Sequence, residues 1–315
     1  MNSIYTGLLF IVVSTVAVYP QQTRRSIAVT IDDLPVVSTR SDLKNRQEIT
    51  KKLLRHIRDS KVPAIGFVNE NKLYRGGKRD PQQIELLKMW LDAGLDLGNH
   101  TFSHRSLNSI SLQEFEDDLI KGETITNELL QERRRRLRYF RHPYLHTGTT
   151  VETKNAFAAF LKSRGYTIAP ITVDNADYIF SQAYDMAFDK GDRKLMKQIG
   201  DAYVPYMEQK LDYWERQSTK TFGREINQTL LLHANFINSD YFDDLARMMK
   251  RRGYRFISLD EALKDEAYAL PDTFLGRAGI SWMHRWTLDK GRENILPNEP
   301  VVPDFVLKSS TFKSE

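Results

Sequence analysis

Two carboxylates and two imidazoles are spaced so that they could share one metal ion. Asp32 and Asp33 are adjacent, and His100 and His104 are four residues apart. If the second segment formed a helical turn, both imidazoles would lie on one side. With one carboxylate they would complete a His2Asp set that leaves positions open for water and substrate, as catalytic zinc sites do. The other carboxylate would be the base, so the spacing predicts metal-assisted hydrolysis. The structural alternative is a pair of surface histidines near two strand-end carboxylates.

These residues need a scaffold that joins distant segments, and the sequence predicts a barrel of parallel strands. Short β-rich segments alternate with longer amphipathic ones, as in repeated βα units. Seven strands are predicted, at residues 26–31, 63–68, 95–98, 138–140, 167–173, 229–232 and 255–257. Polar residues follow six of them: Asp32-Asp33, Asn69, His100, Arg141, Asp174 and His233. Because the carboxyl ends of barrel strands share one face, we expect an active site there.

The remaining segments are expected to extend this barrel rather than form a second domain. Residues 181–215 exceed the length of a plain βα connection and predict two helices that break near 190–192. We interpret residues of about 180–220 as a helical insertion. After Asp265 the periodicity is lost, and three prolines mark an irregular tail. The predicted organisation is a barrel over 23–265 and an extension over 266–315 that packs on or near it.

The composition is that of an enzyme-sized globular protein. The chain has 315 residues, of which 41% are hydrophobic and 28% charged. Its mean hydropathy of −0.50 argues against several membrane spans, and its apolar content argues against disorder. The net charge is +5, but only residues 133–136 and 138 form a dense basic run. We interpret this run as a solvated helix end rather than a polyanion site, and expect no nucleic-acid partner.

Residues 1–22 are expected to be a signal peptide or an N-terminal anchor. Their apolar stretch, about 4–18, is short for a membrane span of about 20 residues. A secretory signal is favoured although no Lys or Arg precedes the stretch, and an uncleaved anchor is the alternative and the one expected route to a membrane. The chain has no cysteine, which excludes a lipoprotein anchor, disulfides and thiolate ligands. We expect export to the periplasm, the cell envelope or the medium.

Five segments resemble, in order, the motifs of the polysaccharide deacetylases of the NodB-homology type, carbohydrate esterase family 4. The family motifs T-F-D-D-G, H-[ST]-x-x-H, R-x-P-[YG], D-x-x-D-W and L-x-H are similar to residues 30–34, 100–104, 141–144, 174–178 and 231–233. The resemblance implies a distorted (β/α)7 TIM-like barrel. Two positions depart from the motifs. Leu34 replaces a glycine and Tyr178 replaces a tryptophan, which leaves the shape of the substrate cleft open.

The resemblance also implies a role for each matching residue. Asp33, His100 and His104 would bind the metal, with Asp32 as general base and Arg141 orienting it.

On the other side of the scissile bond, His233 would be the general acid that protonates the leaving amine. Asp177 would tune His233 or pair with Arg141. The backbone N–H of Tyr144 would contact the oxyanion, and Tyr178 would line the substrate site.

The expected activity is divalent-metal-dependent removal of N-acetyl, or O-acetyl, groups from a glycan such as peptidoglycan or a chitin-like polymer. Zn²⁺ is the expected metal, and Co, Ni or Mn would also suit these ligands. Two alternatives are a C–N hydrolase of a small cyclic amide or ureide and a non-catalytic carbohydrate-binding relative. An acetylated glycan is the expected partner, and the oligomeric state is left open.

Other aromatic and polar residues are expected to be structural. Trp282, His284 and Trp286 could form a sugar-stacking wall, but buried indoles that anchor the tail are favoured. His56 is expected to be a structural residue of an amphipathic helix and Asn69 a turn former.

Overall fold

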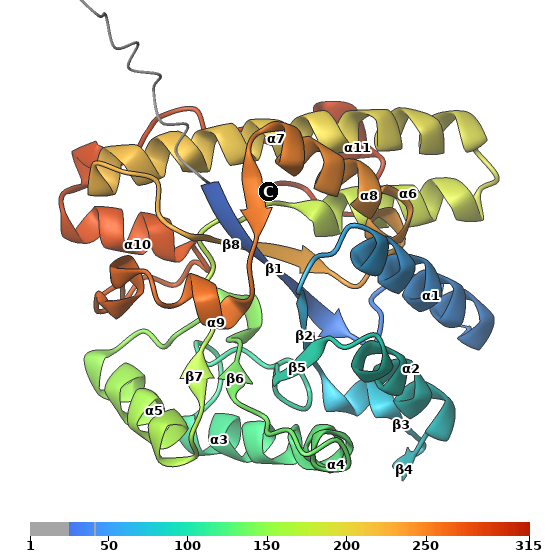
Figure 1. Cartoon of the computed structure of the whole chain (residues 1–315), viewed down its shortest axis with the longest axis horizontal. Coiled ribbons are helices and arrows are strands. Elements are labelled where there is room, and N and C mark those ends of the chain that lie inside the picture. Colours follow the sequence, from blue (N-terminus) through green and yellow to red (C-terminus); the bar gives the residue numbers. More distant parts are fainter. Residues whose placement is uncertain (1–24, 41) are drawn as a thin grey trace, which may run out of the picture.

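Seven parallel strands form a single curled sheet at the centre of the protein (Figure 1). The computed structural model describes residues 25–40 and 42–315, so the expected signal peptide or anchor at 1–22 lies outside the described residues. The strand order is β7-β6-β5-β2-β1-β8, and β9 also pairs with β1. The seven strands are β1 (Arg25–Leu34), β2 (Ile65–Val68), β5 (Asp96–Asn99), β6 (Tyr139–Phe140), β7 (Thr167–Ile168), β8 (Gln228–His233) and β9 (Tyr254–Phe256). All seven predicted strands are present, and the predicted distorted (β/α)7 barrel is confirmed.

The two ends of this strand order meet through a short irregular contact. Strand β7 is shorter than predicted because Pro170 has no N–H and interrupts the segment. Beyond this proline, Val173 forms an isolated parallel bridge with Leu230 of β8. The Thr172 N–H also donates to the Thr229 carbonyl at 3.1 Å. The sheet therefore curls into a distorted barrel that closes over only a few residues.

Helices surround the sheet in Figure 1, with the long helix α7 running across its top. The α-helices are α1 (Leu43–Asp59), α2 (Pro81–Asp92), α3 (Leu112–Lys121), α4 (Thr124–Gln131), α5 (Val151–Ser163), α6 (Asp177–Asp189), α7 (Arg193–Phe222), α8 (Phe236–Arg251), α9 (Leu259–Ala262), α10 (Trp282–Asp289) and α11 (Asp304–Lys308). Helices α6 and α7 are separated at residues 190–192, where the sequence predicts the break. A hairpin of β3 (Tyr74–Arg75) and β4 (Lys78–Arg79), which was not predicted, follows the 3-10 helix η1 (Glu70–Leu73). Within the described residues no helix is long and apolar enough to cross a membrane.

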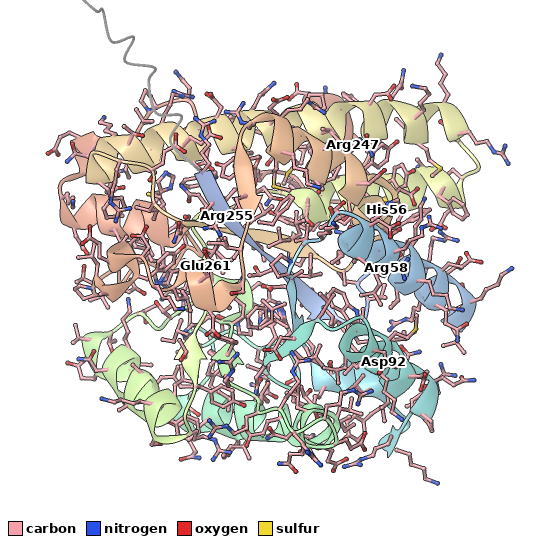
Figure 2. The ribbon with its side chains drawn as sticks, in the orientation of Figure 1. His56, Arg58, Asp92, Arg247, Arg255 and Glu261 are labelled. Carbon is pink, nitrogen blue, oxygen red and sulfur yellow. The ribbon has the colours of Figure 1, made fainter. Side chains whose placement is uncertain are left out.

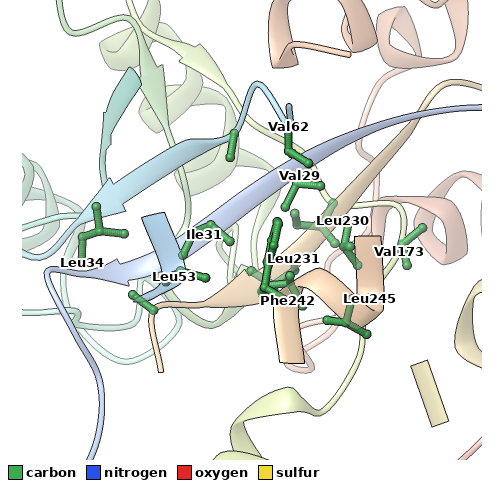
Figure 3. Close-up of a cluster of buried hydrophobic side chains, with 14 of the residues drawn as sticks. Val29, Ile31, Leu34, Leu53, Val62, Val173, Leu230, Leu231, Phe242 and Leu245 are labelled. Carbon is green, nitrogen blue, oxygen red and sulfur yellow. The ribbon is translucent and has the colours of Figure 1, made fainter. Parts of the chain in front are cut away.

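The core lies between the sheet and the helices that cover it. Nearly every residue of β1 is buried, as expected for a parallel strand covered on both faces. Figure 3 shows part of this core, where Val29 and Ile31 of β1 lie near Leu230 of β8 and Phe242 of α8. Tight packing within the sheet depends on glycine, since a Cβ on Gly66 would lie 2.4 Å from a Leu34 methyl carbon. The strand ends are thus held on a rigid scaffold.

The tail after Asp265 contains more structure than its sequence predicts. Helix α10 forms within it, and Trp282 and Trp286 are only 4% and 1% exposed. The favoured interpretation of these indoles as buried anchors is confirmed, because a buried ring cannot form a sugar-stacking wall. Short 3-10 segments η3 (Glu266–Ala269) and η4 (Arg292–Asn294) complete this part of the chain.

His56 has a structural environment, as expected. It lies on α1 beside α8, where its Nδ1 is 3.7 Å from a carboxylate oxygen of Asp243 (Figure 2).

Candidate active site

Asp33, His100 and His104 converge at the carboxyl ends of β1 and β5. Their nearest ligand atoms all lie within 4.8 Å of one another. Asp33 Oδ1 is 3.7 Å from His100 Nε2 and 3.5 Å from His104 Nε2. No other group of three or more His, Cys, Asp or Glu residues in the described chain could hold a metal ion. The structure therefore joins the three predicted ligands.

The backbone that presents the two histidines is a loop, so the predicted helical turn is wrong. Residues 100–104 follow β5 without forming a helix, and Thr101 and His104 have φ values of 65° and 54°. Asp118 of α3 accepts a hydrogen bond from the Ser103 N–H at 3.0 Å, and the Thr101 hydroxyl accepts one from the His104 N–H at 3.1 Å. These bonds hold a left-handed loop that the four-residue spacing alone does not reveal.

The two imidazoles are prepared to act as neutral ligands. The ring Nδ1 of His100 lies 2.8 Å from the Arg141 carbonyl, so a proton on Nδ1 is donated to that oxygen. This contact leaves the lone pair on Nε2, the nitrogen that faces Asp33. Burial lowers the pKa of His100 and of His104, which favours the neutral rings that metal binding requires.

Asp33 has an unsatisfied oxygen in this site. Its Oδ1 is buried and has no hydrogen-bond partner among the described residues. Burial favours the neutral acid, but the positive charges of Lys72 and of His233 oppose it, and the pKa of Asp33 is lowered. A buried anionic oxygen without a donor is costly unless a cation lies against it. The residues present therefore fit a divalent metal ion.

Asp32 lies beside this set and is held by Arg141. Asp32 is 2% exposed and Arg141 is fully buried. The Arg141 Nη1 is 3.3 Å from Asp32 Oδ2, while Nη2 donates to Thr30 at 3.1 Å and Nε to the Ala169 carbonyl at 2.7 Å. Burial raises the pKa of Asp32 to about 6, and the guanidinium limits the rise. Arg141 is thus held by β1 and by the segment that follows β7, and in turn orients the carboxylate.

At the end of the neighbouring strand β8, His233 forms a closed pair with Asp177. The ring Nδ1 of His233 is 2.7 Å from Asp177 Oδ1. Asp177 Oδ2 accepts from the His233 N–H at 2.8 Å and from the amides of Asn238 and Asn235 at 2.6 and 3.2 Å. Burial acts to lower the pKa of His233, but the charge and hydrogen bond of Asp177 outweigh it and raise the value to about 9. His233 therefore carries a proton at neutral pH.

This arrangement decides the question that the motif left open for Asp177. Its carboxylate pairs with His233, and among the described residues it forms no ion pair with Arg141. Asp32 and His233 are register partners on the adjacent parallel strands β1 and β8. The base candidate and the acid candidate therefore lie side by side and face the same space.

Tyr144 reaches the site from the loop after β6. Its backbone has a φ of 57°, and its ring centroid lies 4.4 Å from that of His104. The residue is 55% exposed. Among the described residues its N–H donates to no backbone carbonyl, whereas the N–H groups of Leu145 and His146 donate to His142 and Pro143. The Tyr144 N–H is therefore a free hydrogen-bond donor in the loop next to the predicted metal ligand His104.

Tyr178 flanks the acid side and has an aromatic neighbour that the sequence did not indicate. Its ring centroid is 6.3 Å from His233 and 5.1 Å from Phe312 of the tail. Leu34, the other departure, is fully buried against Gly66 and belongs to the core. The replacement of glycine by Leu34 therefore does not narrow the space above the site.

Two further polar residues lie at the site, of which only Asn69 was noted at a strand end in the sequence. Lys72, in η1, donates to the Asp33 carbonyl at 2.7 Å. Asn69, expected to be a turn former, is buried and donates to the His100 carbonyl at 2.6 Å. Both belong to a polar run directly after β2, so their place at a strand end was the one available signal.

Comparisons with known proteins confirm the resemblance to the polysaccharide deacetylases. A family model described as Polysaccharide deacetylase matches residues 20–166, which include the first three of the five motifs. A search of curated protein sequences finds no match.

Solved structures of a polysaccharide deacetylase and of a CE4 family pseudoenzyme share the fold. A polysaccharide deacetylase from Bacillus cereus aligns with a TM-score of 0.52 at 15% identity, over 75% of this chain and 92% of the other. A CE4 family pseudoenzyme from Bacillus anthracis aligns with a TM-score of 0.50 at 17% identity, over 76% of this chain and 66% of the other. A mutant of that pseudoenzyme with restored enzymatic activity aligns with a TM-score of 0.50 at 18% identity, over 76% and 68%. At these identities the similarity shows the fold, and the activity must be argued from the site.

Proposed function

We propose that this chain, a relative of the polysaccharide deacetylases, is a divalent-metal-dependent hydrolase that removes N-acetyl groups from a glycan. The observation that carries the proposal is the buried, unpartnered Oδ1 of Asp33 between two neutral histidines. This oxygen needs a cation, and hydrolysis by activated water is the chemistry that such an open site supports.

Each residue of the site has a proposed role that its position supports. Asp33, His100 and His104 would hold the metal, with Zn²⁺ expected and Co, Ni or Mn also compatible. When bound, the ion would supply positive charge that acidifies water and favours the oxyanion. Asp32, oriented by Arg141, would take the proton from the attacking water.

The His233–Asp177 pair, at the end of the neighbouring strand, would serve the leaving group. Protonated His233, supported by Asp177, would give its proton to the departing amine, because an amide anion is too poor a leaving group. The free Tyr144 N–H would donate to the oxyanion. The exposed rings of Tyr144 and Tyr178 leave the rim open, which favours a polymer such as peptidoglycan or a chitin-like glycan over a small cyclic amide.

Two related proposals follow. O-acetyl groups would be alternative substrates, since an alcohol leaves with less help from His233. Export, proposed from the apolar segment at residues 4–18, would bring the enzyme to a cell-wall glycan. The complete set of metal ligands, general base and general acid argues against a purely carbohydrate-binding role.

The proposal is tested by measuring acetate release from chitin, peptidoglycan and acetylated xylan fragments after metal is added to the purified protein. We expect release from at least one N-acetylated fragment and its loss in Asp32→Ala. Asp92→Ala, an exposed α2 position that pairs with Arg133 away from the site (Figure 2), is the control and should keep full activity. Glycan binding that ignores metal, without any acetate release, would instead support the carbohydrate-binding alternative.

A further inference from the structure

The loop that carries Tyr144 has a backbone conformation that its own sequence does not explain. Tyr144 and Leu145 are consecutive, and both are left-handed, with φ values of 57° and 55°. Residues other than glycine adopt such angles only where surrounding contacts determine them. Inside the loop there are only two turn hydrogen bonds, from Leu145 to His142 and from His146 to Pro143. Contacts from outside the loop must therefore contribute.

The outside hydrogen bond nearest to Tyr144 along the chain comes from Arg285 in the tail. Arg285 is 1% exposed and lies on α10. Its Nη2 donates to the Leu145 carbonyl at 2.5 Å, and its Nη1 donates to the Thr147 hydroxyl at 2.9 Å. One guanidinium therefore binds the loop at two points, directly after Tyr144.

Arg285 is itself held in place from several sides. Its Nη1 lies 2.7 Å from Asp272 Oδ2, and its Nε donates to the Ile280 carbonyl at 3.0 Å. The guanidinium lies 4.1 Å from the centroid of the Trp282 ring. Asp272 is anchored in turn by Lys154 of α5 at 2.8 Å. Such a fixed planar fork can impose a geometry on the carbonyl that it binds.

A second contact is made by backbone against backbone. A Cβ on Gly279 would lie 1.8 Å from the Tyr144 carbonyl oxygen and 3.3 Å from His146 Cδ2. Only glycine leaves room for this approach. Gly279 and Arg285 thus act on the carbonyls of Tyr144 and Leu145, which follow the free Tyr144 N–H directly.

We propose that Asp272, Gly279 and Arg285, here called the tail clamp, are positioning residues that fix the Tyr144 N–H as the oxyanion donor. The proposal rests on the proposed deacetylase function. The tail clamp touches neither the three metal ligands nor Asp32 and His233, so it acts through the Tyr144 loop alone. Part of the oxyanion site is therefore supplied by the extension after residue 265, outside the 20–166 segment that the family model matches.

The test compares Arg285→Lys with Arg252→Lys. Lysine keeps the charge but cannot bridge Leu145, Thr147 and Asp272 with a planar fork. Arg252, whose side chain is 18% exposed and pairs with Glu215 at 2.6 Å away from the site, provides the control for replacing an ion-paired arginine by lysine. We expect Arg285→Lys to lower kcat for acetate release about 10- to 100-fold. This effect is no larger than the fall in kcat of about 100- to 1,000-fold that follows complete removal of one oxyanion donor. Its KM should stay within about twofold, its metal content should be unchanged, and Arg252→Lys should keep kcat.

A second variant and a second readout keep the test decisive. Asp272→Asn weakens the ion pair that holds Arg285 but changes no residue of the loop. It should lower kcat less than Arg285→Lys does and leave KM unchanged. This variant replaces Arg285→Lys in the test if Arg285→Lys fails to fold. Hydrogen exchange of residues 142–148 should speed up in both variants, and this measurement does not require activity. Wild-type protein that releases no acetate would contradict the proposed function, whereas unchanged exchange and unchanged kcat in folded variants would overturn the clamp.

Discussion

The two sides of the candidate site differ in how completely their charges are satisfied. On the metal side, Asp33 presents a buried oxygen without a hydrogen-bond donor. On the acid side, the two oxygens of Asp177 receive four hydrogen bonds, two from His233 and one each from Asn235 and Asn238. The first side is incomplete until a cation arrives, whereas the second is complete within the chain. Metal should therefore control the first side, and pH the second.

Metal removal should give the largest effect and should act on the metal side alone. Dialysis against a chelator should lower acetate release by more than about 10³-fold, because water then loses its activation. An ion that binds only the folded protein stabilises it by about 2.7 kcal/mol at a concentration 100 times its Kd. Removal of the ion should therefore lower the melting temperature as well. Activity assays and thermal melts before and after Zn²⁺ is restored check both effects. Full activity in the chelated protein would contradict the claim that the metal side depends on a bound cation.

Asp177→Asn should damage the acid side while leaving metal binding intact. The pKa of His233, raised to about 9 by Asp177, should drop, so the alkaline limb of the kcat profile should move to lower pH. The stabilisation linked to a raised histidine pKa is fully present below the unfolded pKa of about 6.5 and is lost as pH rises through about 9.

Wild-type unfolding free energy in the metal-free protein should therefore decline by about 1–3 kcal/mol over that window, and the Asp177→Asn value should not. Denaturant titrations at pH 6, 7.5 and 9.5 measure the slope. Parallel curves for the two proteins would mean that the His233–Asp177 pair does not titrate as described.

Tyr178→Ala should give the smallest effect, since this ring lies on the rim outside both charged sets. An aromatic contact is worth about 0.5–1.5 kcal/mol, so KM for a chito-oligomer should rise about 3- to 10-fold with kcat nearly unchanged. Tyr241→Phe, a partly buried tyrosine of α8 away from the rim, is the control. A change in metal content or in the pH profile of Tyr178→Ala would show that the rim and the charged sides are coupled.

The sequence predicted the strand ends well because hydrophobic runs and the polar residues after them are local signals. His100 and Arg141 follow strands, His233 ends one and Asp32 lies near the end of β1, and a parallel barrel brings such positions together without further information.

Predictions failed where distant contacts decide the conformation. The loop at residues 100–104 is not helical, because Asp118 and local hydroxyl bonds stabilise left-handed residues there. Helix α10 was missed because its burial depends on Arg285 and two indoles that meet the barrel from 140 residues away along the chain. Lys72 was missed because its place in the polar run after β2 is a weak signal, and its hydrogen bond to the Asp33 carbonyl adds no further pattern to the sequence.

Metal titration of Asp33→Asn against Asp32→Asn tests the central claim most directly. The two variants make the same chemical change at adjacent residues, and asparagine tolerates the left-handed backbone that Asp33 adopts. Calorimetric titration of the metal-free proteins with Zn²⁺ should find one tight site in the wild type and in Asp32→Asn, and at least 100-fold weaker binding in Asp33→Asn. Equal losses of affinity in both variants, or none in either, would contradict the assignment of Asp33 as ligand and Asp32 as base.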